Sequence, residues 1–524
     1  MPTKLPPSIF NDVVGPVMRG PSSSHSAASV RIGRIARDLC GGTPARVLVE
    51  FDTHGSLPTT HVSQGSDMGL FGGLLGWEAD DARIPESGAA LKQAGVDLEI
   101  RYVDLRDPHP NTYRLTITRD DVEHRLVALS TGGGMIEVIE IDGYAVALFG
   151  DYDVTLLEVD GAAAAAAAAA LSDACDDVQV VDGEPALVVA SGQAFVDDAT
   201  LGSVRGLRRT RRVGAVLPVR SRAGLTVPFL HASEMLEGRD PKAGPLSDFA
   251  LEFERARGGL DDEGVFARMR HILEIVKRGV AGGLAGTEYA DRILPQQSHR
   301  FRELLEQGQL LDGGMLNRAV LYVTALMETK SSMGVIVAAP TAGSCATFPA
   351  TCLAAAESVH ADEARTLRAM LAAGLIGVFV TTRSSFAAEV GGCQAETGAG
   401  AAMAAAALVE LGGGTAAQAL SAASHALQNV LGLICDPVAN RVEAPCLGRN
   451  VAGASNAFVS ANMALAGYDH LVPLDEVLDA HREVSERMAR ELRCTALGGL
   501  SITPTSKAIE ARLADAGGCG SCDS

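Results

Sequence analysis

The sequence predicts a multidomain protein with three parts of different fold: an α+β N-terminal domain, a ferredoxin-like middle domain and a mainly α-helical C-terminal domain. The 524 residues are too many for one ordinary hydrophobic core. Strand-like and helix-like segments alternate in the first two parts, and helical periodicity dominates the third. The composition, 47% hydrophobic and 21% charged, is typical of globular domains. The expected boundaries are 1–150, 151–222 and 223–512, followed by a flexible tail at 513–524.

The first two parts contain the predicted strands. In residues 1–150 a helix and four strands are expected, the last two strands forming a hairpin. In residues 151–222 the order βαββαβ is the split ferredoxin-like pattern. This part resembles an ACT domain, a module that often binds amino acids, but a spacer or oligomerisation domain fits as well. The expected elements are a helix at Ser29–Leu39, strands at Val47–Phe51, Leu98–Val103, Thr112–Thr118 and His124–Leu129, then Val154–Val159 (strand), Gly161–Cys175 (helix), Val178–Val181 and Ala186–Ala190 (strands), Asp197–Gly206 (helix) and Val213–Val219 (strand).

The third part reads as helices separated by glycine-rich junctions. Such helices can bury small-residue faces around a central site. The expected helices are Val265–Arg278, Leu316–Glu328, Ala361–Ala373, Ala399–Glu410, Ala416–Gly432 and Leu474–Leu492.

Charge and cysteine content limit the classes of partner and compartment. The net charge of −20 argues against nucleic acid, whose phosphates need a basic surface. The N-terminus has no apolar signal-peptide core, and no stretch reaches the roughly 20 uninterrupted apolar residues of a membrane helix. We therefore expect a cytoplasmic protein without a membrane partner. In a reducing compartment the ten scattered cysteines are expected to be free, metal-bound or catalytic.

Three cysteines of the helical part lie beside glycines, prolines or helix boundaries: Cys393, Cys435 and Cys446. Backbone NH groups at such places are free to face a negatively charged iron–sulfur cluster. Three thiolates would leave one iron open to act as a Lewis acid. Spacing alone does not establish this, because a single buried cysteine is more often a packing residue. The absence of compact Cys-x-x-Cys spacings in this part disfavours zinc.

Several motifs, in order along the chain, closely resemble the iron–sulfur L-serine dehydratases. They are GPVMRGPSSSHS (15–26), GGLLGWEADDARI (72–84), HPNT (109–112), GGG (132–134), MGVIVAAPTAGSC (333–345), GGCQAE (391–396), LGLICDPVANRVEAPCLGRN (431–450) and TALGGLSITPT (495–505). The family's N-terminal (beta) and catalytic (alpha) regions can be separate subunits. Here they would be fused, with the ACT-like part between them.

The resemblance implies an amino-acid-degrading lyase that converts L-serine to pyruvate and ammonia. A [4Fe–4S] cluster on Cys393, Cys435 and Cys446 would act on the 3-hydroxyl of the substrate, and no pyridoxal phosphate would be needed. The small-molecule substrate is an amino acid, and we expect a homo-oligomer, a dimer. Cys40, Cys175 and Cys494 are expected not to be needed for iron binding, whereas Cys519 or Cys522 of the tail could cap the open iron unless the tail is simply disordered.

Other site residues also follow from the resemblance. His25 and His109 are expected to be catalytic, because an imidazole suits proton transfer near neutral pH. The serines of the SSSH turn are candidates to bind the substrate, or they cap the helix that follows. The backbone NH groups of the PTAGS turn could receive its carboxylate, and Cys345 beside them is expected to be a packed thiol. The substrate-binding candidates are Ser22, Ser23, Ser24, Thr341, Ala342, Gly343, Ser344 and Arg383.

Two departures from the family pattern raise the question of substrate. Gln64 stands where the family usually has a histidine, so the role of that histidine is lost or is taken by another group such as His54, His61 or His109. Arg383 replaces a neutral asparagine. It forms either an internal salt bridge, possible with Glu389, or a fork for a second substrate carboxylate.

Three interpretations therefore stay open. The chain is an L-serine dehydratase, or a related lyase acting on threonine, cysteine or a β-hydroxy dicarboxylic amino acid, or a non-catalytic cluster protein that senses amino acids. The intact SSSH and PTAGS turns favour an enzyme. The Arg383 argument predicts that an acidic β-hydroxy amino acid is turned over better than serine.

Overall fold

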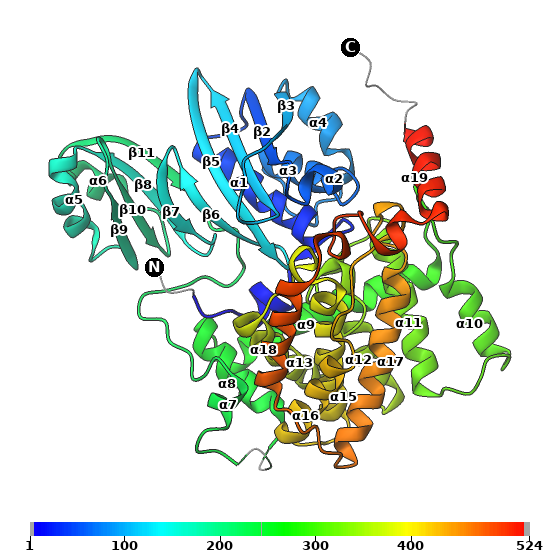
Figure 1. Cartoon of the computed structure of the whole chain (residues 1–524). Coiled ribbons are helices and arrows are strands. Elements are labelled where there is room, and N and C mark those ends of the chain that lie inside the picture. The colour runs from blue at the N-terminus through cyan, green and yellow to red at the C-terminus, as the bar shows by residue number, and fades with distance from the viewer. Residues whose placement is uncertain (1–4, 241, 243, 518–524) are drawn as a thin grey trace.

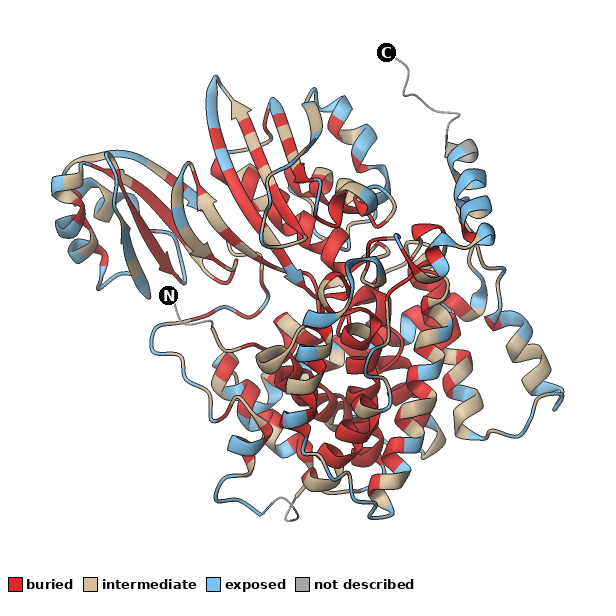
Figure 2. Cartoon of the chain, viewed as in Figure 1, coloured by how far each residue is buried: buried red, intermediate tan, exposed pale blue. Residues whose placement is uncertain are grey.

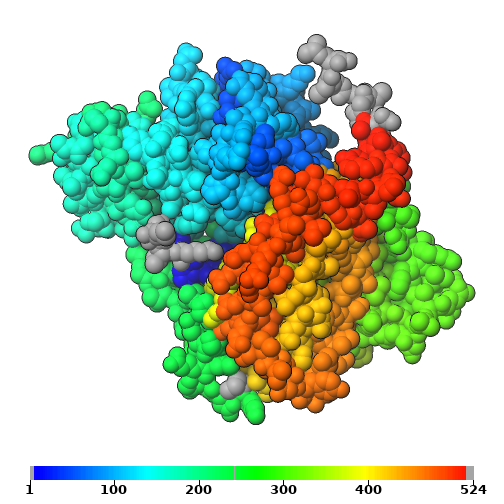
Figure 3. Space-filling model, in the orientation of Figure 1, coloured from blue at the N-terminus to red at the C-terminus, as the bar shows by residue number. Residues whose placement is uncertain are grey.

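The computed structural model describes residues 5–240, 242 and 244–517. It combines a six-stranded sheet, a four-stranded sheet and a large group of helices (Figure 1). Both sheets lie above the helical part in this view, and the space-filling view shows the N-terminal part seated directly on the helices (Figure 3). This mixed architecture agrees with the predicted multidomain protein.

The six-stranded sheet carries its helices on one face because its strands alternate buried apolar and more exposed residues. Val47 and Val49 of β2 and Leu115 and Ile117 of β4 are buried, and residues two apart on a strand share a face. That face packs against α1 and α3. The strand order is β3-β2-β4-β5-β6-β7, with β2 and β3 parallel and the other pairs antiparallel. The elements are α1 (Ala28–Leu39), β2 (Arg46–Asp52), α2 (Leu57–Thr60), α3 (Ser66–Leu74), α4 (Ser87–Gln93), β3 (Asp97–Val103), β4 (Thr112–Arg119), β5 (Val122–Gly132), β6 (Met135–Ile141) and β7 (Tyr144–Leu148).

Glycines at the crossing of α1 and α3 position the turn that carries His25. A Cβ on Gly73 would lie 2.2 Å from Val30 O, and one on Gly33 would lie 2.5 Å from Leu70 O. The two helices therefore approach more closely than larger residues would permit. The turn η2 (Ser23–Ala27) leads directly into α1, so this packing sets where His25 lies.

The four-stranded sheet has the order β11-β8-β10-β9, and all its pairs are antiparallel. Along the chain the elements alternate as βαββαβ, as the sequence predicts. Val154 and Leu156 of β8 face the core of the first sheet, whereas Leu157 and Val159 face α5. Both faces are thus buried. The likeness to an ACT domain stays a prediction. The elements are β8 (Asp153–Val159), α5 (Ala164–Leu171), β9 (Asp177–Val181), β10 (Ala186–Gly192), α6 (Asp198–Ser203) and β11 (Leu207–Val213).

The last of these strands corrects the sequence prediction, which placed it at Val213–Val219. The strand is β11, and its run of four arginines hid it from an analysis of hydrophobic pattern. Charged side chains are tolerated there because β11 is an edge strand and pairs only with β8.

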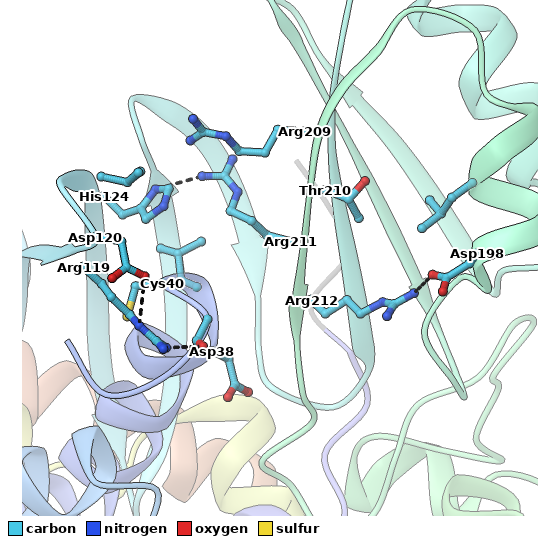
Figure 4. A pocket seen from close by; sticks show the side chains of 14 residues that line it. Asp38, Cys40, Arg119, Asp120, His124, Asp198, Arg209, Thr210, Arg211 and Arg212 are labelled. Carbon is cyan, nitrogen blue, oxygen red and sulfur yellow. Dashed lines mark hydrogen bonds and ion pairs between the residues drawn. The ribbon is translucent and has the colours of Figure 1, made fainter.

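The arginines of β11 also connect the two sheets. Arg211 is buried and forms ion pairs with Asp142 of the β6–β7 turn and with Glu158 of β8. It also contacts His124 of β5 at 3.0 Å (Figure 4). A pocket of about 560 Å³ lies at this junction and is lined by Arg209 and Arg119 among others (Figure 4). The pairing of Arg211 holds the middle part against the first.

The helical part is built around α13 and α15. All residues of α15 are buried, and it contacts α13, α16 and α17. Buried residues accordingly concentrate at the centre of this part (Figure 2). The helices are α7 (Ala232–Leu236), α8 (Leu246–Gly258), α9 (Asp262–Ala285), α10 (Ser298–Glu306), α11 (Met315–Ser331), α12 (Pro349–Ser358), α13 (Glu363–Arg383), α14 (Ala388–Gly391), α15 (Ala399–Leu411), α16 (Ala416–Gln428), α17 (Cys446–Leu465), α18 (Leu474–Arg487) and α19 (Pro504–Gly517).

Helix α13 extends ten residues beyond its predicted end at Ala373. The prediction stopped before Gly374 because glycine often ends helices, but Gly374 and Gly377 here make room for the N-terminal segment. A Cβ on Gly377 would lie 2.0 Å from Val13 Cγ1. By length and hydropathy α13 could cross a membrane, yet 78% of its apolar window is buried inside the protein.

Seven helices of the helical part were not predicted: α7, α8, α10, α12, α14, α17 and α19. At the other end of the chain, α19 continues to Gly517, past residue 513 where the flexible tail was expected to begin. The small residues of α12 and α17 carry little periodic signal, and packing rather than pattern makes these two segments helical.

The N-terminal segment ties the sheet part to the helical part. β1 (Val17–Met18) pairs antiparallel with β12 (Ile336–Val337). In the residues before β1, Ser8 Oγ and Ile9 N donate hydrogen bonds to the fully buried carboxylate of Glu254 on α8, at 2.6 Å and 2.8 Å. Burial raises the pKa of Glu254 to about 7.

This pKa predicts a pH-dependent contribution to stability. A carboxyl whose folded-state pKa lies above the unfolded value of 4.5 contributes stability that is fully present below that value and is lost as the pH rises through about 7. Glu254→Gln removes the titration. We expect its melting temperature, relative to wild type, to increase between pH 5 and pH 8, by an amount corresponding to at most about 3 kcal/mol.

Circular dichroism melts at several pH values would measure this difference. Glu252→Gln is the matched control on the same helix, because Glu252 forms an exposed pair with Arg239. A pH-independent difference for Glu254→Gln would contradict the prediction.

Candidate active site

The three predicted cluster ligands lie together where the helical part meets the N-terminal part. Cys393 follows α14, Cys435 lies in the loop after α16, and Cys446 is the first residue of α17. All three are buried. The Sγ atoms of Cys393 and Cys435 and a carboxylate oxygen of Glu396 lie within 4.8 Å of one another. Burial and the nearby charge of Cys393 raise the pKa of Cys446.

A partly buried arginine compensates the charge of one of these thiols. Arg449 Nη1 donates to Cys393 Sγ at 3.2 Å, and its Nη2 forms an ion pair with Asp436. The hydrogen bond from Cys435 and the charge of Arg449 lower the pKa of Cys393 to about 7. Because the thiolate is the form that binds metal, Cys393 is prepared to act as a ligand. Arg449 lies one helical turn after Cys446 on α17, so one helix supplies both a thiol and the cation.

A fourth thiol, Cys494, joins this group and was not predicted to take part. Cys494 belongs to a buried cluster with Ala388, Cys393 and Cys435. Gln64 Nε2 donates to Cys494 Sγ at 3.2 Å, which places that departure from the family pattern beside the thiols. Cys494 lies almost 50 residues beyond the third predicted ligand, in a segment without cysteine spacing, so only the fold reveals it. Cys519 and Cys522 lie outside the described residues.

Two further charged groups, Glu396 and Lys330, were missed by the sequence analysis. Burial and the neighbouring Cys393 raise the pKa of Glu396 to about 8. The Lys330 side chain is almost fully buried at the end of α11, donates to Val442 O and exerts its charge on Glu396 and Cys446. Lys330 also lines a pocket of about 180 Å³ between the N-terminal and helical parts. A fully buried lysine is rare and therefore points to a functional role, but the sequence does not show that Lys330 is buried.

The SSSH and PTAGS turns, more than 300 residues apart, contact each other. Ala342 N donates to Ser23 Oγ at 3.2 Å. Thr341 Oγ1 donates to Glu396 Oε1 at 2.7 Å. Gly343 lies against this carboxylate, since a Cβ there would be 2.9 Å from Glu396 Oε1. The PTAGS turn is also closed by a reciprocal pair of hydrogen bonds between Thr341 and Ser344. The NH groups of Ala342 and Ser344 are therefore already bonded within the protein.

His25 is completely buried and hydrogen-bonded through both ring nitrogens. Nδ1 lies 3.0 Å from Ser22 Oγ and 3.3 Å from Glu389 Oε1, and Nε2 lies 2.8 Å from Thr60 Oγ1. Burial, together with the charge of His61, lowers the pKa of His25 to about 3, so the ring is neutral at physiological pH. Ser24 is buried as well, and its carbonyl oxygen accepts a hydrogen bond from Ser130.

The three histidines that could take the role of the one lost at position 64 each have a partner in the structure, and that role stays a prediction. His61 is bonded to Asp67 at 2.7 Å and to Tyr102 at 2.6 Å, so both of its nitrogens are occupied. His54 is exposed and pairs with Asp104. His109 accepts a hydrogen bond from Asn111 N, and burial lowers its pKa. Among the described contacts, none joins His109 to the thiols.

Arg383 has internal carboxylate partners, but Glu389 is not one of them. Its Nη1 lies 2.9 Å from Asp479 and its Nε lies 3.5 Å from Asp475, both on α18. The sequence analysis considered Glu389 as the partner, and the structure corrects this: Glu389 lies beside His25 instead. A substrate contact of Arg383 stays a prediction. Cys345 is buried in the helical core, as expected of a packed thiol, and burial raises its pKa to about 12.

Comparison with known proteins gives consistent matches. The sequence model of the family "Serine dehydratase alpha chain" matches residues 208–501. The chain is 37% identical over 285 residues to the probable L-serine dehydratase alpha chain of Bacillus subtilis (strain 168), which covers 54% of this chain and 95% of that relative. It is 38% identical over 279 residues to the L-serine dehydratase alpha chain of Peptoniphilus asaccharolyticus (53% and 96%). The probable L-serine dehydratase beta chain of Bacillus subtilis (strain 168) is 41% identical over 150 residues, covering 29% of this chain and 67% of that relative.

Proposed function

This chain belongs to the iron–sulfur L-serine dehydratase family and carries the beta and alpha regions fused in one polypeptide, and we propose on this premise that it dehydrates and deaminates L-serine to pyruvate and ammonia. One observation supports the proposal. The buried thiols of Cys393 and Cys435 lie close together with the carboxylate of Glu396, which bonds the PTAGS turn where that turn meets the SSSH turn, and the buried Cys446 is an electrostatic neighbour of Cys393. Sequence elements of the two regions would thus form one site.

The three buried cysteines suit an iron–sulfur cluster. Cys393, Cys435 and Cys446 would hold it, because they are buried, free of disulfides and close to the compensating cation of Arg449. When bound, a [4Fe–4S] cluster with three thiolate ligands supplies a Lewis acid for the 3-hydroxyl of the substrate. Pyridoxal phosphate is not part of this proposal.

The chain's own residues would bind and enclose the substrate. Ser22 and Ser23 place hydroxyl groups at the meeting point of the two turns, where an amino acid's carboxylate or ammonium needs partners. Lys330 is the buried cation on the side of the 180 Å³ pocket and suits the carboxylate of an entering substrate. The burial of this region excludes water, which strengthens each of these interactions.

A panel assay tests the proposed function. The protein would be purified without oxygen and incubated with serine, threonine, cysteine and a β-hydroxy dicarboxylic amino acid, while 2-oxo acid formation is followed by ultraviolet absorbance. We expect turnover of serine that disappears after iron chelation and resists hydroxylamine, a carbonyl reagent that traps pyridoxal phosphate. A protein that contains the cluster but converts no amino acid would instead support the sensor interpretation.

The paired state of Arg383 allows a prediction about substrate preference. Its ion pairs with Asp475 and Asp479 compensate the charge of the guanidinium without a substrate carboxylate, while its Nε makes no hydrogen bond among the described residues. We expect Arg383→Asn to change turnover of serine and of the dicarboxylic amino acid by the same factor. A selective loss of the dicarboxylic substrate in kcat/KM measurements would instead place Arg383 at the substrate, as the sequence analysis suggested.

A further inference from the structure

Glu389 is a buried carboxylate that the proposed function does not yet use. It lies on the short helix α14, four residues before Cys393, and its side chain is only 2% exposed. Oε1 lies 3.3 Å from His25 Nδ1, whereas Oε2 has no hydrogen-bond partner among the described residues. Buried polar atoms without a partner are uncommon and cost free energy. An exception of this kind beside a candidate site points to a function.

Among the described residues, no cation neutralises Glu389. Within the described part of the chain no lysine or arginine forms an ion pair with it, and Arg383 and Arg449 pair with other carboxylates. His25 is its ion-pair neighbour but is neutral at physiological pH, because burial lowers its pKa to about 3. The electrostatic neighbours of Glu389 include the acidic groups of Tyr113, Glu396 and Cys494. Burial also raises the pKa of Glu389, so that its carboxylate binds a proton more strongly than an exposed glutamate.

The carboxylate of Glu389 lies next to the buried cysteines of the candidate site. Ala388, the preceding residue, packs in the same buried cluster as Cys393, Cys435 and Cys494. The Asn111 side chain contacts Glu389 from the other side, and its Nδ2 has no well-directed hydrogen bond in the described structure. Glu389 thus lies between His25, Asn111 and the buried thiols, where the substrate would have to reach it. A substrate whose hydroxyl is held at the thiol side would present its α-carbon there.

We propose that Glu389 is the base that removes the α-proton of the amino-acid substrate, and that His25 and Asn111 hold its carboxylate in position. The inference rests on the proposed function. It supplies the proton acceptor that Gln64 cannot be, because an amide is not basic, and that His54 and His61 cannot be, because one is exposed and the other has both nitrogens occupied.

The step balances without a further reactant. Oε2 of Glu389 takes the α-proton, and the electron pair of the C–H bond becomes the second bond of a double bond between Cα and Cβ. The Cβ–O bond breaks, and its electron pair leaves with the hydroxyl. The proton on Glu389 then joins the departing hydroxyl as water, which returns Glu389 to its carboxylate form. The 2-aminoacrylate that remains tautomerises and hydrolyses to the 2-oxo acid and ammonia.

Glu389→Gln tests the proposal, because it keeps the shape of the side chain and removes its basicity. We expect the turnover number to fall at least about 100-fold, while iron and sulfide content and calorimetric serine binding stay within about twofold of wild type. Glu389→Asp keeps a base at a shifted position and should retain intermediate turnover, with a larger kinetic isotope effect on serine deuterated at Cα than wild type shows. The matched control is Glu410→Gln. Glu410 is another buried glutamate; it lies on α15 and accepts a hydrogen bond from Ser247 of α8.

The outcomes separate the two levels of inference. If wild type converts serine and Glu389→Gln is as active as Glu410→Gln, Glu389 is not the base, and the proposed function stands. If Glu389→Gln loses iron, or if Glu389→Asp is as inactive as Glu389→Gln with an unchanged isotope effect, the role is structural and the proposal is overturned. If wild type holds its cluster but converts no amino acid, the proposed function itself fails.

Discussion

Replacing Cys393, Cys435 or Cys446 by serine is expected to remove the iron and sulfide of the anaerobically purified protein and to abolish 2-oxo acid formation. Each thiol is buried in the candidate site, so no neighbouring water or exposed side chain can replace the lost ligand easily. The loss should exceed the roughly 10–100-fold typical of changes in the surroundings of a metal. Iron and sulfide analysis, with the visible absorption of the cluster, measures the effect independently of turnover.

Cys352→Ser is the matched control for these variants. Cys352 is equally buried, lies in α12 within the helical core, and burial raises its pKa to about 12. A packed thiol of this kind should retain full iron content when it is replaced. Full iron retention in any one of the three predicted ligands would reject that residue as a ligand.

Cys494→Ser is the informative comparison. The sequence predicts that Cys494 is dispensable for iron, whereas the structure places it in the buried cluster with Cys393 and Cys435. We expect the cluster to assemble on the other three thiolates in this variant. Loss of iron equal to that of the three ligand variants would instead extend the ligand set to four.

Arg449→Leu is expected to have the second largest effect. The substitution removes the cation from Cys393 and leaves the buried carboxylate of Asp436 without its partner. Breaking such a pair costs about 3–5 kcal/mol, and the thiolate of Cys393 becomes harder to form. We therefore expect a lower melting temperature of the iron-free protein and reduced iron content after reconstitution.

Two other variants test the cause. Arg449→Lys keeps the positive charge but lacks the planar fork that reaches Cys393 and Asp436 together, so intermediate values are expected. Arg270→Leu removes an exposed arginine from its pair with Glu363. Exposed pairs contribute about 1 kcal/mol or less, and iron content should not change. Equal effects of Arg449→Leu and Arg270→Leu would contradict the argument.

The sequence by itself determined the family, the three parts and the approximate position of most helices and strands. Local signals suffice there, because alternation with period two and period 3.6 reflects which face of an element is buried. The motifs around Cys393, Cys435 and Cys446 predicted a common site before any contact was known. The same signals failed at two places. The arginine-rich edge strand β11 has the polar pattern typical of a loop, and Gly374, which packs inside α13, looks in the sequence like the end of a helix.

Only the tertiary structure decided which side chains surround the thiols. Lys330, Glu389 and Cys494 lie outside the quoted motifs, and Arg449 lies inside one that does not reveal its partners. Their roles depend on burial and on partners far away in the chain. For example, Arg383 pairs with Asp479 of α18, and Glu389 lies beside His25. Charge compensation in a buried site is a property of distances between elements. Those distances are fixed when the N-terminal part packs on the helices, and no local sequence pattern contains them.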